Sequence, residues 1–139
     1  MPEKIKLDIV TPDRPILSES VDEVQIPGKE GYLGVLPGHA PLISELTIGE
    51  ISYRQGVHTS YLAVTWGFAE VLPDKVTILA ERAEKAEEID LQRALSSKAR
   101  AEKRLAQVND TDIDFQRAQL SLQRAVIRIQ VAKHMGVGA

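Results

Sequence analysis

The pattern of apolar and polar positions along residues 1–81 shows short strand-like stretches separated by turns, with no helical period. In residues 5–10 (IKLDIV), aliphatic side chains alternate with charged ones, and the prolines of the TPDRP segment that follows exclude a helix there. Short strands separated by frequent turns predict a compact antiparallel sandwich or barrel. Further strands are predicted over residues 16–26, from about Glu50, from His58 across a Gln55–Gly56 turn, and over residues 68–72 and 75–80 around a turn at Pro73 and Asp74.

From about Glu84 onwards the apolar period becomes helical. Asp90 and Asp114 each precede an apolar-periodic run, where a carboxylate accepts backbone N–H groups and favours the positive end of the helix dipole. The polar segment VNDTD (residues 108–112) leaves only a short connection, so the two helices must lie antiparallel. The sequence predicts an α+β protein with a β-sandwich over residues 1–83 and a helical hairpin over residues 84–139.

Small residues dominate the predicted contact between the two helices. An alanine in place of a buried leucine forgoes about 2–3 kcal/mol per site. We therefore expect a hairpin that can dock and undock, although an alanine-rich seam is also compatible with a tight, static hairpin. The predicted seam consists of Leu91, Ala94, Leu95, Ala101 and Leu105 in the first helix and of Ala118, Leu122, Ala125, Ile129 and Ala132 in the second.

The segment IDLQRA (residues 89–94) recurs as IDFQRA (residues 113–118), and the correspondence continues along both helices at an offset of 24 residues. The corresponding positions include three arginines in each helix. Because 7 and 11 residues are close to whole numbers of helical turns, the arginines of each helix share one face. The two rows are Arg93, Arg100 and Arg104, and Arg117, Arg124 and Arg128.

Charge is distributed unevenly along the chain, although the formal net charge is only -3. Residues 1–81 hold 6 Lys and Arg against 12 Asp and Glu, residues 82–139 hold 11 against 8, and no acidic residue follows Asp114. This asymmetry predicts two parts that contact different partners. Clustered arginines repel one another until a polyphosphate such as ATP neutralises them through bidentate bonds. A carboxylate partner is the alternative, as is a solvated face on which the arginines pair with Glu84, Glu87, Glu88 and Glu102.

Catalytic motifs are absent from the sequence. There is no P-loop, and the glycine-containing GVLPGH segment (residues 34–39) lies among strands with no helix after it to receive a phosphate. His39, His58 and His134 are scattered without metal-ligand spacing, and the chain contains no cysteine. We therefore expect a protein that is not an enzyme by itself.

Two other classes are disfavoured. No apolar run is long enough to cross a membrane, so any membrane association is expected to come through a partner. The helical part carries arginines but only one aromatic residue, Phe115, for stacking on bases, and it is joined to an acidic sandwich that would repel a phosphate backbone. We expect no nucleic-acid binding.

Three segments together resemble the epsilon subunit family of bacterial and chloroplast F-type ATP synthases. They are GYLGVLPGHAPLI (residues 31–43), WGFAEVLPDKVTILAE (residues 66–81) and IDLQRA with the arginine-rich hairpin after it. The resemblance covers essentially the whole chain. Trp66 departs from it by standing where a small residue is expected, and Tyr32 by standing where an acidic residue is common.

The resemblance implies a non-catalytic subunit of the rotating central stalk, which helps to couple proton-driven rotation to ATP synthesis. The partners it implies are the gamma subunit and the membrane-embedded c-ring, with ring contacts at Glu30, Tyr32 and His39. No cofactor would be required. The implied location is peripheral, on the cytoplasmic face of the bacterial inner membrane or on the stromal face of thylakoids.

The resemblance also implies a regulatory hairpin that folds when it binds ATP. Arg93, Arg100, Arg124 and Arg128 would face the phosphates, with Ile89, Asp90 and Ala94 on the adenine or ribose side and Glu84 in support. When ATP falls, the hairpin would extend and inhibit ATP hydrolysis by contacting the catalytic alpha and beta subunits through Arg117, Arg124, Arg128 and Lys133. The alternative is a rotor subunit whose structural or inhibitory hairpin does not bind ATP.

Overall fold

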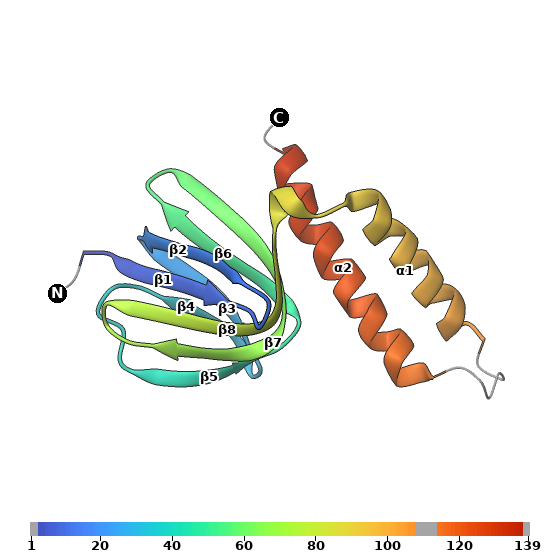
Figure 1. Ribbon diagram of the computed structural model, residues 1–139, viewed down its shortest axis with the longest axis horizontal. Helices are drawn as coiled ribbons and strands as arrows, with labels where there is room; N and C mark the ends of the chain where they lie inside the picture. The colour runs from blue at the N-terminus through green and yellow to red at the C-terminus, as the bar shows by residue number, and fades with distance from the viewer. Residues whose placement is uncertain (1–2, 108–113, 138–139) are drawn as a thin grey trace. The chain divides into compact units, whose positions relative to one another are not determined.

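The computed structural model describes residues 3–107 and 114–137 and divides into two compact units, Met1–Lys85 and Ala86–Ala139 (Figure 1). The first unit is a β-sandwich and the second a helical hairpin. The sandwich contains β1 (Ile5–Val10), β2 (Pro15–Val21), β3 (Glu23–Gly28), β4 (Gly31–Val35), β5 (Leu42–Leu46), β6 (Gly49–Gln55), β7 (His58–Val71) and β8 (Lys75–Lys85). The second unit contains the short 3-10 helix η1 (Ala86–Glu88), α1 (Leu91–Leu105) and α2 (Phe115–Val137).

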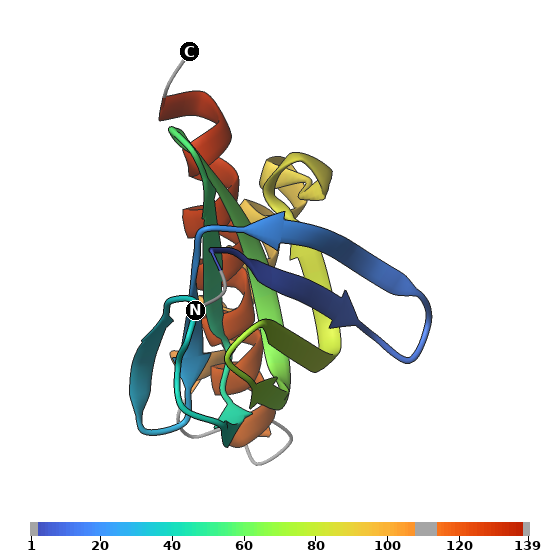
Figure 2. The ribbon, with the colours of Figure 1, turned by 90° about the vertical axis from the view of Figure 1, so that its left-hand side faces the viewer.

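A single sheet in the order β2-β1-β8-β7-β5-β3-β4, with β6 paired to β3 and β7, folds over into the sandwich (Figure 2). The long strand β7 makes this possible, because it pairs with β6 up to Val64 and with β5 from Gly67 onwards. Among the described residues the strand pairs are antiparallel except for β1 and β8, which run parallel. Hydrophobic alternation is the same in both kinds of pair, so it does not set strand direction.

All eight strands contribute aliphatic side chains to one core. In β1 the predicted alternation is confirmed, since Ile5, Leu7 and Ile9 are fully buried. Burying such a side chain contributes roughly 1.5–3 kcal/mol relative to leaving it exposed. Other core residues are Val21, Val24, Ile26, Val35, Leu46, Ile51, Leu62, Val64 and Ile78.

The predicted hairpin between β6 and β7 and the turn at Pro73 and Asp74 are confirmed. The strand predicted over residues 16–26 is instead two strands, because the chain leaves the β1 partner at Val21 and joins β4 and β6 from Glu23. Helical structure begins at Ala86, two residues after the predicted start near Glu84. Glu84 pairs with Ala63, so β8 continues along β7 to Lys85.

In the second unit, α1 and α2 pack side by side and run antiparallel, as predicted (Figure 1). Both predicted caps are confirmed. The Asp90 carboxylate accepts the backbone N–H of Arg93 at 3.1 Å, and the Asp114 carboxylate accepts that of Arg117 at 3.0 Å. The helices are 15 and 23 residues long, and the predicted connection over residues 108–112 lies outside the described residues.

Buried alanines line both helices of the hairpin. Ala94, Ala101, Ala118 and Ala125 are each at most 2% exposed, which confirms the alanine-based seam. Ile129 is buried as well, and Leu91, Leu105, Leu122 and Ala132 are half-buried. The placement of Leu95 in the seam is wrong, because this side chain is 40% exposed. One residue turns a helix by about 100°, so a seam centred on Ala94 and Ala101 carries Leu95 away from it.

Candidate functional site

An exposed apolar face lies across four neighbouring strands of the sandwich, β1, β8, β7 and β5. Leu79 on β8 pairs with Val10 on β1 and with Phe68 on β7, and the inward positions beside them, Ile9 and Ile78, are fully buried. Phe68 and Leu79 are 55% and 56% exposed. We call this surface the apolar face, and it consists of Val10, Ile43, Trp66, Phe68 and Leu79.

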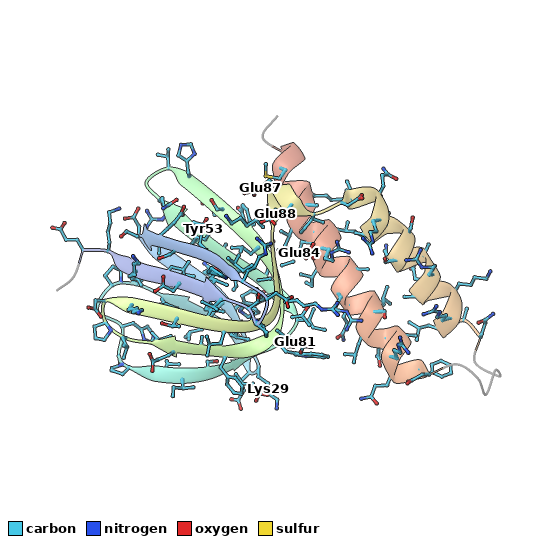
Figure 3. The ribbon with its side chains drawn as sticks, viewed as in Figure 1. Lys29, Tyr53, Glu81, Glu84, Glu87 and Glu88 are labelled. Carbon is cyan, nitrogen blue, oxygen red and sulfur yellow. The ribbon has the colours of Figure 1, made fainter. Side chains whose placement is uncertain are left out.

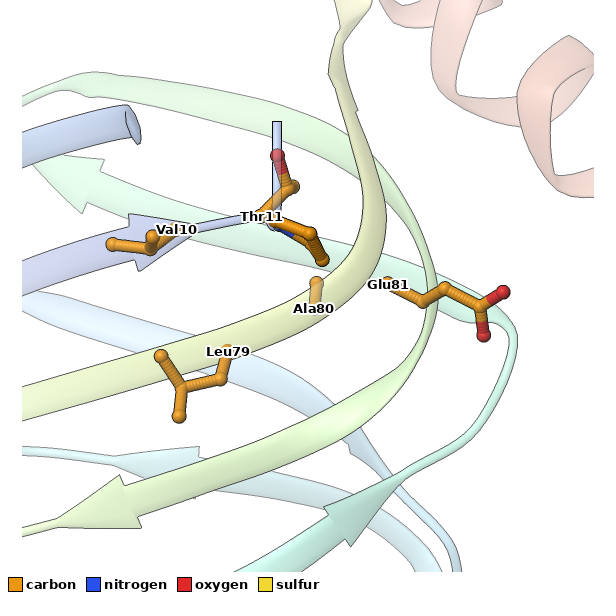
Figure 4. Close-up of a pocket in the computed structure, with 6 residues that line it drawn as sticks. Val10, Thr11, Leu79, Ala80 and Glu81 are labelled. Carbon is orange, nitrogen blue, oxygen red and sulfur yellow. The ribbon is translucent and has the colours of Figure 1, made fainter. Parts of the chain in front are cut away.

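A shallow pocket of about 420 Å³ opens beside the apolar face, between β8 and the turn after β1. Figure 4 shows the Glu81 carboxylate directed away from Val10 and Leu79. The residues that line the pocket are Val10, Thr11, Pro12, Leu79, Ala80 and Glu81. Large contiguous apolar surfaces with a polar rim mark interaction sites.

Charged side chains surround the apolar face. Glu45 pairs with Phe68 and forms an ion pair of 3.4 Å with Lys29. Asp8, two residues before Val10, lies 3.6 Å from the Lys75 ammonium group. The hydrogen bond from Ser18 is the main reason why the pKa of Asp8 lies below its ordinary value; desolvation opposes it, and the charges of Lys75 and Lys6 add to the lowering.

The apolar face includes a strained corner at Trp66 and Gly67, where β7 changes partner from β6 to β5. Trp66 has a φ of +46°, in the left-handed region, and Gly67 has a φ of +147°. A Cβ atom at Gly67 would lie 2.0 Å from the Leu79 carbonyl oxygen, so only glycine fits there. For Trp66, by contrast, the left-handed conformation costs about 1–2 kcal/mol that glycine would avoid.

The predicted ring contacts do not gather at one place. Glu30 lies in the turn before β4, and His39 lies in the loop after it, so a five-residue strand of about 16 Å separates them. Tyr32 on β4 is exposed, and its hydroxyl accepts the backbone N–H of Glu50 at 3.0 Å. The His39 ring donates from Nδ1 to the Ala40 carbonyl at 2.7 Å.

Both arginine rows of the hairpin lie on the same side. Arg93 and Arg100 each precede a buried seam alanine of α1 by one residue, and Arg117 and Arg124 stand in the same relation to the seam alanines of α2. Each row is therefore turned about 100° from the seam in the same sense. In antiparallel helices that face each other, this relation directs both rows to one side, the arginine face, which also includes Arg104 and Arg128.

The repeated sequence also repeats its contacts. Arg100 donates to the Ser97 hydroxyl at 3.1 Å in α1, and Arg124 donates to the Ser121 hydroxyl at 3.3 Å in α2. Arg93, Arg100, Arg104 and Arg117 are exposed, whereas Arg124 and Arg128 are half-buried. The arginine face thus combines exposed guanidinium groups with others that are already ordered against the helix.

Other predicted nucleotide contacts are distributed differently. Asp90 and Ile89 stand just before α1, and one oxygen of Asp90 is used for capping. Ala94 is fully buried, so the folded hairpin keeps its side chain away from solvent. Glu84 belongs to β8 of the first unit, whereas Glu87 and Glu88 belong to η1 (Figure 3). Lys133 is exposed near the end of α2.

Sequence reasoning missed the apolar face. The only signal was the presence of Phe68 and Leu79 at positions opposite in phase to the buried residues of their strands, and that phase is not known before the core is known. Within the described residues, no group of three or more His, Asp or Glu side chains is placed to hold a metal ion. Neither helix that the structure describes has the length and apolar character needed to cross a membrane.

The fold and the site define a two-domain chain, with a small β-sandwich that has an exposed apolar face followed by a basic helical hairpin. Residues 4–86 match the β-sandwich domain, and residues 87–133 the long α-helix domain, of the ATP synthase Delta/Epsilon chain. The chain belongs to the ATP synthase epsilon chain family and is therefore a non-catalytic subunit of ATP synthase.

Relatives agree with this membership, and a solved structure shows the same fold. The ATP synthase epsilon chain of Syntrophobacter fumaroxidans is 55% identical, over 96% of this chain and 98% of its own length. The ATP synthase epsilon chain of Geotalea daltonii is 50% identical, over 98% of this chain and 99% of its own length. A chain in the Euglena gracilis mitochondrial ATP synthase structure has the same fold, with a TM-score of 0.80 at 24% identity, over 99% of this chain and 83% of that one.

Proposed function

We propose that this chain is a rotor subunit of the central stalk of an F-type ATP synthase, where it helps to couple proton-driven rotation to ATP synthesis by other subunits. The apolar face is the observation that carries this proposal. Its exposed aromatic and aliphatic side chains require a protein partner to cover them. We assign this partner to the gamma subunit, the stalk partner that the family resemblance implies. The Euglena chain of the same fold was solved in an assembly with F1 and the c-ring.

The opposite ends of β4 are proposed to meet the c-ring at two places. Tyr32 and the neighbouring Glu30 form one place, and the loop that carries His39 forms the other. The Gly38 N–H donates to the Pro73 carbonyl at 2.7 Å, which fixes this loop against the turn between β7 and β8. Through these partners the chain would be held peripherally at the cytoplasmic face of the membrane, or at the stromal face in a plastid.

The docking role is tested with Phe68→Ser and Leu79→Ser. Each variant removes a large apolar side chain from the centre of the face, and we expect the affinity for F1 depleted of the epsilon chain to fall about 10-fold or more. Val57→Ser is the matched control, because Val57 is 94% exposed at the tip of the β6–β7 hairpin, outside the face. Wild-type affinity in both face variants would refute the docking role.

The hairpin is proposed to act as a regulatory switch with ATP as its ligand. The convergence of both arginine rows on one face supports this, because repulsion between the rows opposes folding until a polyanion neutralises them. Because alanines fill the seam, the free-energy difference between the folded and the open hairpin stays small enough for a ligand to shift. An allosteric coupling of about 1–3 kcal/mol changes populations 5-fold to 150-fold, and a ligand at 100 times its dissociation constant contributes about 2.7 kcal/mol.

Hydrogen exchange of the hairpin amides tests this switch. In the wild-type chain, ATP is expected to slow the exchange of α1 and α2, and Arg93→Ala or Arg124→Ala is expected to abolish that effect. Lys103→Ala is the control, since Lys103 lies about half a turn from the seam of α1. Equal protection in all variants, together with no heat on titration with ATP, would leave a structural or inhibitory hairpin that does not bind ATP.

An inhibitory role is proposed for α2 when the hairpin is extended. The helix carries basic residues and no acidic ones, so it suits acidic surfaces of the alpha and beta subunits. The proposed contacts are Arg117, Arg124, Arg128 and Lys133. Replacing Arg117 and Lys133 with Glu should relieve inhibition of ATP hydrolysis by the assembled complex at low ATP, and unchanged inhibition would refute these contacts.

A further inference from the structure

Trp66 occupies a backbone conformation that suits glycine. Its φ of +46° lies in the left-handed region, where a bulky residue is an outlier. The corner of β7 imposes this conformation, because the strand leaves β6 after Val64 and joins β5 at Gly67. A glycine at position 66 would adopt it without strain. The topology therefore explains the backbone at this position but not the indole.

The core does not explain the indole either. Trp66 is 36% exposed and is not part of the cluster of buried residues that fills the sandwich. It lies instead at the end of the apolar face, two residues before Phe68 along β7. Backbone strain persists mainly where it serves a function. Tryptophan is also enriched among the residues that dominate the energetics of protein interfaces.

We propose that Trp66 is the anchor residue through which the apolar face binds its partner, held in its binding position by the strained corner. A side chain that is ordered in advance loses less conformational entropy on binding. The inference rests on the docking role proposed above for the apolar face. It goes further by naming the residue that dominates the affinity and by specifying the surface that receives it.

Charges beside the indole define that receiving surface. Thr65 pairs with Arg82 and Gly67 with Ala80, so Trp66 stands opposite the exposed Glu81. Glu45, which pairs with Phe68 in the sheet, is already in an ion pair with Lys29, whereas the exposed Glu70 lies two residues beyond Phe68 along β7. The partner surface is therefore an apolar recess edged by Lys or Arg side chains, and we commit to the gamma subunit as the partner that supplies it.

Trp66 is the only tryptophan of the chain, which provides a direct spectroscopic readout. In full-length protein labelled with 5-fluorotryptophan, the single ¹⁹F resonance is expected to shift and broaden when F1 depleted of the epsilon chain is added. Trp66→Gly keeps the backbone conformation and is expected to weaken binding about 30-fold or more. Circular dichroism should show the same β content in this variant, and Val57→Ser should bind as the wild type does.

The outcomes separate this inference from the proposed function. If Trp66→Gly binds as tightly as the wild type while Phe68→Ser does not, the anchor is refuted and the docking face stands. If all of these variants bind normally, both fail. An indole resonance that F1 leaves unchanged, but that ATP shifts in the isolated chain, would assign Trp66 to the hairpin and overturn the proposal.

Discussion

The carboxylate of Asp22 accepts the backbone N–H of Gly56 at 2.6 Å, although the two residues are 34 positions apart. Asp22 stands between β2 and β3, where the chain changes strand partners, and Gly56 forms the tip of the β6–β7 hairpin with a φ of +64°. Asp22 also accepts a hydrogen bond of 2.9 Å from the Lys4 ammonium group. One half-buried carboxylate thus fixes a corner of the sandwich to a distant turn.

Acid should weaken this link. The Gly56 N–H, and then Lys4, hold the pKa of Asp22 below its ordinary value of 3.8. A carboxylate whose pKa is lowered in the folded state stabilises the fold above its unfolded pKa, and the contribution is lost as pH falls through the folded pKa. Asp22→Asn should lower the unfolding temperature by a few degrees at neutral pH and flatten its dependence on pH below about 4.

Thermal unfolding followed by circular dichroism between about pH 3 and pH 7 measures both effects. Asp13→Asn is the matched control, because Asp13 is exposed in the turn between β1 and β2. If the Asp22 and Asp13 variants show the same unfolding temperatures at every pH, the link between the corner and the hairpin does not stabilise the fold.

Two glycines of the sandwich should respond to alanine in opposite ways. At Gly67 a Cβ would meet the Leu79 carbonyl oxygen at 2.0 Å in a left-handed backbone, so Gly67→Ala should destabilise the chain by about 2–4 kcal/mol. At Gly34 a Cβ would meet nothing within 4 Å, so Gly34→Ala should stabilise it by about 0.4–1 kcal/mol. Denaturant unfolding of both variants measures the difference, and similar losses in both would contradict it.

The sequence was sufficient where structure depends on near neighbours. Alternation predicted β1, and carboxylates before apolar runs predicted both helix caps. The sequence was insufficient where pairing with a distant strand sets the end of an element. The break at Asp22 arises because β2 and β3 have different partners, and β8 reaches Lys85 because β7 is long enough to pair with it there.

The candidate site follows the same division. Helical geometry alone placed three arginines on one face of each helix, but directing both rows to one side of the hairpin required knowledge of which alanines are buried. The apolar face needed still more, because Phe68 and Leu79 meet only through the pairing of β7 with β8. Before that pairing is known, their apolar side chains are equally compatible with the core.

The alanine seam predicts how the folded hairpin responds to a larger side chain. Ala101 is 2% exposed, so Ala101→Leu overpacks the seam and should destabilise the folded hairpin by about 1–3 kcal/mol. Hydrogen exchange should then become faster for amides of α1 and α2, with little change in β1 or β7. Ala99→Leu, at an exposed position of α1, is the control. Unchanged exchange in Ala101→Leu would show that the seam has room for larger side chains.

Asp90 and Asp114 provide a matched pair that separates capping from ligand binding. Each caps its helix through one carboxylate oxygen, at 3.1 and 3.0 Å, and serine is an equally good cap. Asp90→Ser and Asp114→Ser should therefore both leave the helix content unchanged. If Asp90 also binds the ribose of ATP, only Asp90→Ser should weaken ATP binding in isothermal titration, by about 10-fold or more for a lost hydrogen bond to a charged group. Equal ATP affinities in the two variants would confine Asp90 to capping, and the nucleotide contacts would then have to come from the arginine face alone.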